Sequence, residues 1–241
     1  VLTWGAVAEV PVTADWQRQV RDLVGAQRPP KGLAFAGGVI GHLAYEAGRF
    51  SERMAPGRGP SVTGDGLFRR YPGALLFTPQ GWVAAGEASW VHQAKRRVEA
   101  LPALAPSRTV FARLSKVPPD VDFARGVEEI LARIAVGECY QVNLSRALVF
   151  ESEEQPATLF ARLPLAPHGA FLRWRDSVLM SDAPELFWRL HEGQVQTRPI
   201  KGTAPIGAKA QLLADSKEQA ELTMIVDLMR NDLGRVCLPG T

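Results

Sequence analysis

Apolar residues recur at intervals of three and four in several stretches of the chain, which is the spacing of one helix face. The first stretch spans 16–24 and is followed by Gly25, a residue that commonly ends helices. A second runs from Val91 to Leu101. The most regular covers 123–134, where the apolar residues share one face. The pattern therefore predicts a helix at each of these three places.

The third of these helices and a last one over 217–233 carry end signals. Asp122 is the expected N-cap of the third helix, and Gly137 is the residue expected to stop it. For the last helix, Ser216 is the expected N-cap, with Gln219 completing a capping box.

Between the helices, alternating apolar residues and turn residues predict β-strands. Residues 74–78 and 82–85 are separated by Pro-Gln-Gly and predict a hairpin. Residues 171–174 and 178–181, joined through Arg-Asp, predict another. A further strand is expected over 195–200.

Directly after the third helix, the apolar period changes to two. Tyr140, Val142 and Leu144 alternate with Gln141 and Asn143. In a strand, this alternation places the two sets on opposite faces. We therefore expect a strand with Gln141 on its polar face, opposite a packed core.

Strands in hairpins with interspersed helices predict an α+β fold rather than alternating βαβ units. A stretch rich in proline between Pro102 and Pro119 is typical of a connector. It predicts two parts, residues 1–118 and residues 119–241.

The composition is that of an ordinary globular protein, since 46% of the 241 residues are hydrophobic and 22% are charged. The net charge is +3, but 28 basic residues are balanced by 25 acidic ones, and the densest basic run is Lys95-Arg96-Arg97. Without a basic stripe, nucleic-acid binding is not expected. A small anionic substrate is compatible with this balance.

The two cysteines, Cys139 and Cys237, lie far apart and lack the spacing of a metal site. No run approaches the roughly 20 apolar residues of a membrane helix, and the N-terminus does not resemble a signal peptide. We therefore expect a cytoplasmic protein without disulfides or a membrane segment. The chain starts at Val1 and stops at Thr241 just after a strong helix, and we expect it to be a fragment.

Lys201 is the most informative candidate for chemistry. It lies in a polar and turn-forming run, 196–203, where a structural lysine has no evident purpose, so we interpret it as a nucleophile. Glu218 and Glu221 lie three apart on one helix face, where carboxylates repel unless they share a cation. They predict either a site for a divalent metal or two surface glutamates near a helix start, with Lys217 paired to Glu221.

Four segments together resemble the chorismate-utilising enzymes, and within that family component I of aminodeoxychorismate synthases. The resemblance implies an anthranilate synthase component I-like fold, with antiparallel sheets and surrounding helices, incomplete at both ends. It implies that the first part is the family's N-terminal region, with its start missing, and the second the first half of the catalytic chorismate-binding domain. The segments are 137–146, 183–185, 196–203 and 226–232.

The resemblance also implies roles for single residues. Lys201, within Pro-Ile-Lys-Gly-Thr, matches the lysine of aminodeoxychorismate synthases that attacks C2 of chorismate, where anthranilate synthases carry alanine. Glu185 matches the general acid that protonates the departing hydroxyl, although alanine precedes its Pro-Glu pair where the family usually has serine. Gly202 and Thr203 match positions that contact chorismate. Gln141 is expected to contact substrate, and because its amide cannot deprotonate water, it disfavours the water addition of isochorismate synthases.

In this family the residue matching Glu221 binds Mg²⁺, and the one matching Glu218 supports the metal site from nearby. Mg²⁺ keeps several waters and takes one or two protein carboxylates, so the carboxylate of chorismate would complete its shell. Further metal-site glutamates of the family lie beyond Thr241. The chain is therefore expected to hold half of the site and to be inactive by itself.

The implied reaction is amination of chorismate at C4 with ammonia, which gives 4-amino-4-deoxychorismate for para-aminobenzoate and folate synthesis. The chain has no glutaminase cysteine motif, so a glutamine amidotransferase subunit is expected to supply the ammonia. Two alternatives stay open, namely an anthranilate synthase component I and an inactive fragment of the enzyme.

Overall fold

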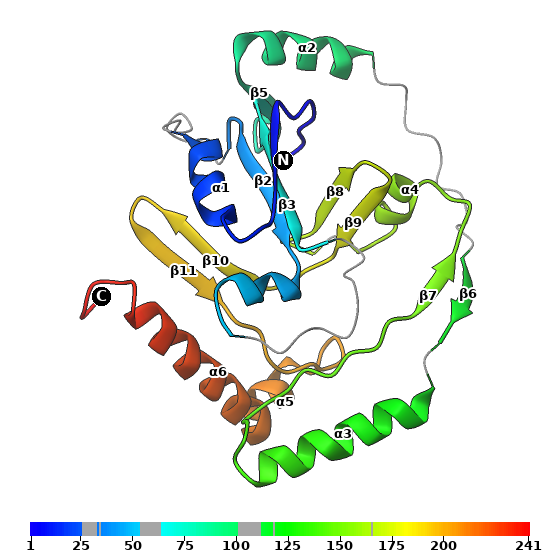
Figure 1. Cartoon of the computed structure of the whole chain (residues 1–241), viewed down its shortest axis with the longest axis vertical. Coiled ribbons are helices and arrows are strands. Elements are labelled where there is room, and N and C mark those ends of the chain that lie inside the picture. Colours follow the sequence, from blue (N-terminus) through cyan, green and yellow to red (C-terminus); the bar gives the residue numbers. More distant parts are fainter. Residues whose placement is uncertain (26–32, 34, 54–63, 101–111, 118, 165) are drawn as a thin grey trace. The chain divides into compact units, whose positions relative to one another are not determined.

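The computed structural model describes residues 1–25, 33, 35–53, 64–100, 112–117, 119–164 and 166–241. The chain forms two compact units, Val1–Ser107 and Arg108–Thr241 (Figure 1). This division precedes the boundary expected after residue 118, and much of the expected connector lies outside the described residues. The functional naming of the two parts stays a prediction.

Unit 1 contains an antiparallel sheet of three strands in the order β1-β3-β2. Helix α1 packs on this sheet, with the ring of Trp16 stacked 5.5 Å from that of Phe68. The predicted first helix is confirmed, and it ends at Gly25, whose φ is +60°. The elements are β1 (Ala8–Pro11), α1 (Trp16–Val24), β2 (Gly38–Leu43), the 3-10 helix η1 (Tyr45–Phe50) and β3 (Gly66–Tyr71).

The second layer of unit 1 is the predicted hairpin, which is confirmed as β4 (Gly73–Thr78) and β5 (Gly81–Gly86). Helix α2 (Ala88–Glu99) packs against it, while the expected helix end at Leu101 lies outside the described residues. A small core forms between them from Leu75, Trp90 and Ala94. The Trp90 indole N–H donates a 3.1 Å hydrogen bond to the carbonyl of Trp4, which ties the N-terminal segment to α2.

The close approach of β4 to α2 depends on Gly73. A Cβ atom at this position would lie 2.4 Å from Cε3 of Trp90 and 2.8 Å from the carbonyl oxygen of Ala85. Because neither the indole of a 4% exposed tryptophan nor the paired strand can move aside cheaply, glycine is required for this packing.

Unit 2 consists of two-stranded antiparallel pairs and four helices in the part of the chain that the structure describes. The strands pair as β6–β7, β8–β9 and β10–β11. The elements are β6 (Arg113–Lys116), α3 (Asp120–Ala135), β7 (Val149–Glu151), α4 (Pro156–Phe160), β8 (Ala170–Trp174), β9 (Ser177–Ser181), β10 (Leu186–His191), β11 (Gln194–Arg198), α5 (Lys209–Ala214) and α6 (Ser216–Gly234).

Two of the predicted strand features are confirmed in unit 2. The hairpin expected over 171–181 is β8–β9, and Phe171 packs against Phe160 of α4 with ring centroids 5.4 Å apart. The strand expected over 195–200 is β11, although it ends at Arg198. Its partner β10 was not predicted from the sequence, because an apolar run of Leu-Phe-Trp does not distinguish a strand from other structure.

The strand predicted around 140–145 is wrong. Residues 141–148 are neither helix nor strand, and Tyr140, meant to face a core, is 89% exposed. A strand requires a hydrogen-bonded partner, and among the described residues none pairs with this segment before β7. Gln141 therefore lies on irregular exposed chain rather than on the polar face of a strand.

The predicted third helix is confirmed as α3, but its start differs. It begins at Asp120 with Pro119 in the N-cap position, so Asp122 lies inside the first turn rather than capping it. Its stop is as predicted, because Gly137 has φ +79°. The amides of Gly137 and Glu138 donate to the carbonyls of Ile134 and Arg133, which closes the helix end with paired hydrogen bonds.

The last predicted helix is confirmed as α6, with Asp215 rather than Ser216 as its N-cap. The Asp215 carboxylate accepts from the amides of Lys217 at 2.9 Å and Glu218 at 3.2 Å. The Gln219 side chain donates to the carbonyl of Leu213 and so does not close a capping box. In the described part of the chain, no helix is both long and apolar enough to span a bilayer.

Replacing Gly73 by alanine puts a methyl group into the space of the Trp90 indole. We expect the free energy of unfolding of unit 1 to fall by about 1–3 kcal/mol, the usual cost of overpacking. Gly234→Ala is the matched control, since a Cβ there meets no atom within 4 Å. Urea unfolding followed by tryptophan fluorescence measures both variants. An unchanged midpoint for Gly73→Ala would contradict the close packing of β4 on α2.

The cap assignment of α6 makes a second prediction. Asp215→Ala removes the acceptor of two amide hydrogen bonds and should destabilise the start of α6 by about 0.5–2 kcal/mol. Ser216→Ala, one residue along, should have little effect. Hydrogen exchange at the amides of Lys217 and Glu218 reports the difference. Faster exchange in the serine variant than in the aspartate variant would show that Ser216 is the cap.

Candidate active site

Lys201 lies in the loop that leads from β11 to α5, and it is half-buried. The next residue, Gly202, has φ +82°, a conformation that side chains with a Cβ rarely adopt. Glycine therefore suits the position directly after the lysine.

Gly202 packs closely against the start of α6. A Cβ atom built on it would lie 2.8 Å from Cδ1 of Leu212 and 3.2 Å from Oε2 of Glu218. A residue with a Cβ would have to push these two side-chain ends aside. The contact places the backbone of the lysine loop beside the first carboxylate of α6.

One face of helix α6 is less exposed to solvent than the rest of the helix. Glu218, Glu221, Ile225 and Met229 are half-buried and follow one another at intervals of three and four residues. The hydroxyl of Thr197 in β11 lies 3.9 Å from the sulfur of Met229, so β11 contacts this face further along the helix. Both glutamates therefore share the face that meets β11 and its loop, as their spacing predicts.

Glu185 lies just before β10, across the hairpin from the lysine loop. Its Oε1 accepts a 3.2 Å hydrogen bond from the backbone amide of Ile200. The pairing of Leu186 with Arg198 sets this position, because it brings the residue before β10 next to the residues after β11. An exposed carboxylate is thereby tied to the residue that precedes Lys201.

Glu221 also takes part in the ion pair that the sequence suggests as an alternative. Its Oε1 lies 3.8 Å from Nζ of Lys217, whose side chain is 77% exposed. An ion pair this long and exposed contributes little to stability.

The acidic groups suit a metal only with help from other ligands. Within the described residues there is no cluster of three or more His, Cys, Asp or Glu side chains that could hold a metal ion. Two carboxylates on one helix face fit Mg²⁺, which takes one or two from the protein and completes its shell with water and an anionic substrate. The two carboxylates therefore fit a magnesium site whose remaining ligands are water and an anionic substrate.

Two of the predicted site residues are not joined to this group. Thr203 is exposed in the loop after Gly202, and Gln141 is exposed in the irregular segment after α3. The contacts recorded for the described residues link neither to Lys201, Glu185 or the α6 carboxylates.

Sequence reasoning missed two residues that shape the site. Leu212 forms the apolar wall against Gly202, and no local signal marks it out from other leucines. Asp215 orders the turn that carries Glu218. The sequence does contain a signal for Asp215 as the N-cap, because aspartate and serine are both strong N-cap residues and the two are adjacent at 215 and 216.

The chain is similar in sequence to known proteins over most of its length. The profile of the chorismate binding enzyme family matches residues 6–241. Aminodeoxychorismate synthase component 1 of Salmonella typhimurium is 36% identical, over 93% of this chain and 53% of the relative. Anthranilate synthase component 1 of Methanothermobacter thermautotrophicus is 31% identical, over 88% of this chain and 48% of the relative. The chain thus spans about half the length of the curated relatives it matches.

A solved structure has the same fold. Anthranilate synthase component I of Streptococcus pneumoniae superposes with a TM-score of 0.79 and 22% identity, covering 97% of this chain and 61% of that chain. The likeness confirms the expected α+β fold of the anthranilate synthase component I type. Together with the profile match over nearly the whole length, it leads to one conclusion: the chain belongs to the chorismate binding enzyme family.

Proposed function

We propose that the protein aminates chorismate at C4 with ammonia, giving 4-amino-4-deoxychorismate on the way to para-aminobenzoate and folate. The observation that carries the proposal is the packing of Gly202 on Glu218, which brings the lysine loop to the acidic face of α6. The names of two relatives support the same reaction. Aminodeoxychorismate synthase component 1 is the name of the 36% identical Salmonella protein and of a 33% identical one from Klebsiella aerogenes.

In this mechanism the uncharged amine of Lys201 attacks C2 of the chorismate ring. The bond between C4 and its hydroxyl oxygen breaks, and a proton from Glu185 lets the hydroxyl leave as water. Ammonia then forms a bond to C4, and the bond between C2 and the lysine nitrogen breaks. Because Lys201 occupies C2 in the intermediate, the incoming nitrogen is directed to C4.

The position of Glu185 supports its role as the acid. Its hydrogen bond to the Ile200 amide holds the carboxyl group next to the residue that precedes the nucleophile. A proton donor that acts on the C4 hydroxyl and a nucleophile that attacks C2 of the same ring must lie in the same small site. The hairpin β10–β11 supplies that proximity through a strand pairing rather than through a long flexible loop.

Glu221 and Glu218 would hold Mg²⁺ on the α6 face. The ion, when bound, would neutralise the ring carboxylate of chorismate and fix its orientation. Gly202 would let the backbone approach the substrate closely, and Thr203 and Gln141 would offer a hydroxyl and an amide to it. A glutamine amidotransferase subunit would supply the ammonia.

A second candidate is amination at C2, the reaction of an anthranilate synthase. Its support is the 31% identical anthranilate synthase component 1 of Methanothermobacter thermautotrophicus. Lys201 favours C4, because a lysine bonded to C2 blocks that carbon from ammonia. Chromatographic separation of the two aminated products decides between the candidates.

Removal of the Lys201 amine tests the covalent step. With chorismate, ammonium and Mg²⁺, we expect Lys201→Ala in the full-length protein to lose C4 amination by about 10³-fold or more, the scale found when a covalent nucleophile is removed. Lys209→Ala, an exposed lysine on the neighbouring helix α5, is the matched control and should retain activity. Undiminished C4 amination by Lys201→Ala would refute the mechanism.

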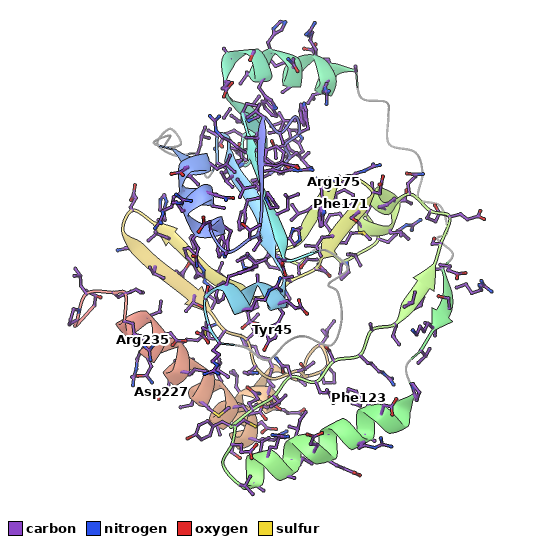
Figure 2. The ribbon with its side chains drawn as sticks, viewed as in Figure 1. Tyr45, Phe123, Phe171, Arg175, Asp227 and Arg235 are labelled. Atoms are coloured by element: carbon purple, nitrogen blue, oxygen red, sulfur yellow. The ribbon has the colours of Figure 1, made fainter. Side chains whose placement is uncertain are left out.

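The proposed metal site makes chorismate binding depend on Mg²⁺. We expect Glu218→Gln, at the supporting position, to weaken Mg²⁺-dependent chorismate binding by about 10- to 100-fold. Glu221→Gln removes a proposed metal ligand and should weaken this binding more. Asp227→Asn on the same helix (Figure 2) is the control. Asp227 forms an exposed ion pair with Arg230, so its replacement should leave binding unchanged. Calorimetry with and without a chelator measures all three. Equal chorismate affinity in the presence and absence of Mg²⁺ would contradict the assignment.

A further inference from the structure

A connector of four residues, 182–185, carries the proposed acid from one hairpin to the next. Strand β9 ends at Ser181, and β10 begins at Leu186. Glu185 is the last residue of this connector and lies outside both hairpins. The pairing of β10 with β11 therefore fixes only one end of the connector.

Packing contributes little to holding the connector in place. Pro184 and Glu185 are exposed, and Asp182 and Ala183 are half-buried. An exposed side chain keeps its rotamer freedom unless hydrogen bonds remove it. Where the Glu185 carboxyl group lies is therefore set by hydrogen bonds and by the backbone that carries it.

The turn before β8 binds the first half of the connector. The backbone amide of Ala166 donates a hydrogen bond to the carboxylate of Asp182. The amide of His168 donates a 3.0 Å hydrogen bond to the carbonyl of Ala183. Both donors belong to one tight turn, which the amide of Gly169 closes with a 3.0 Å hydrogen bond to the carbonyl of Ala166. Two consecutive residues of the connector are thus bound to the same turn.

Of these two bonds to the connector, only the one to Asp182 depends on the identity of a side chain. The bond to Ala183 uses a backbone carbonyl, which every residue has. A hydrogen bond from a backbone amide to a carboxylate is also stronger than one between neutral groups. Asp182 is therefore the part of this anchor that a substitution can remove.

The second half of the connector is held at its other end. The Glu185 side chain accepts a 3.2 Å hydrogen bond from the amide of Ile200. Between the two anchors, the ring of Pro184 fixes its own φ and disfavours a helical conformation at Ala183. A shift at Asp182 is therefore transmitted along a stiff segment to Glu185.

We propose that Asp182 is a positioning residue for the proton donor Glu185. The inference rests on the proposed function, because it requires Glu185 to be the acid. Without the Asp182 carboxylate, the connector loses one of its two bonds to the turn, and the Glu185 carboxyl group moves away from the Ile200 amide. A misplacement of about 1 Å in a reacting group can cost about 10²-fold in rate.

Hydrogen exchange tests the structural part of the proposal in the full-length protein. We expect Asp182→Ala to lose protection at the amide of Ile200, because its acceptor is displaced. Asp182→Asn keeps an oxygen acceptor and should retain that protection. The amides paired within β8–β9 should stay protected in both variants, which distinguishes a shift of the connector from unfolding of the hairpin.

Amination kinetics test the chemical part. Asp182→Ala should lower kcat about 10- to 100-fold and leave KM for chorismate nearly unchanged, because a misplaced acid slows bond breaking rather than substrate binding. Asp182→Asn should restore most of the rate. In a Glu185→Gln background, Asp182→Ala should cost less than about twofold, because no acid is left to position.

Asp176→Ala is the matched control. Asp176 is exposed in the turn between β8 and β9, at the end of the hairpin away from the connector and next to Arg175 in Figure 2. Its replacement should change neither the protection of Ile200 nor kcat.

Three results would overturn the proposal. They are unchanged protection of Ile200 in Asp182→Ala, an unchanged kcat in that variant, and an equal loss of rate with and without the Glu185 carboxyl group. Failure of the proposed function is seen separately, as a wild-type protein that forms no 4-amino-4-deoxychorismate or a Glu185→Gln variant with the full rate. Either of these would leave Asp182 without an acid to position, so the proposal would fall as well.

Discussion

The candidate site depends on one short contact, that between the backbone of Gly202 and the carboxylate of Glu218. A side chain at residue 202 would occupy the space that Leu212 and Glu218 already fill. Because this position carries no Cβ, the lysine loop lies close to the start of α6 without displacing these two side chains. The remaining pieces follow from that approach: Thr197 meets Met229 further along the same helix face, and Glu185 binds the amide of Ile200 on the other side of the loop.

Features of the fold that depend on neighbouring residues were predictable from the sequence. The hairpins β4–β5 and β8–β9 are set by local turn residues and alternation, the helices α1 and α3 by their apolar period, and α6 by its end signals. The strand at 140–145 failed because alternation shows only that a segment suits a sheet, whereas pairing requires a distant partner. The N-cap was misplaced by three residues for α3 and by one residue for α6, where Asp215 and Ser216 are both capping residues and adjoin.

The candidate site residues could be singled out from the sequence, but their arrangement could not. Lys201 stands out in the sequence because a lysine in this polar, turn-forming run has no evident structural purpose. Glu218 and Glu221 stand out by their spacing on one helix face, although that spacing also fits two surface glutamates with Lys217 paired to Glu221. The hydrogen bond from Ile200 to Glu185 could not be foreseen, since it arises from the register of β10 on β11, and β10 itself was not predicted. For Thr203 and Gln141, the expected substrate contacts stay predictions, because neither is joined to the group in the described contacts.

The left-handed backbone of Gly202 has a consequence for how this sequence can diverge. Any other residue there meets the torsional obstacle set by φ +82°, and its Cβ would also press on the side-chain ends of Leu212 and Glu218. The two obstacles differ in kind, because those side-chain ends can move, whereas the torsion belongs to the backbone of residue 202 itself. A change at residue 212 can therefore ease the contact but not the torsion, so the torsion limits which residues can replace glycine as the sequence diverges.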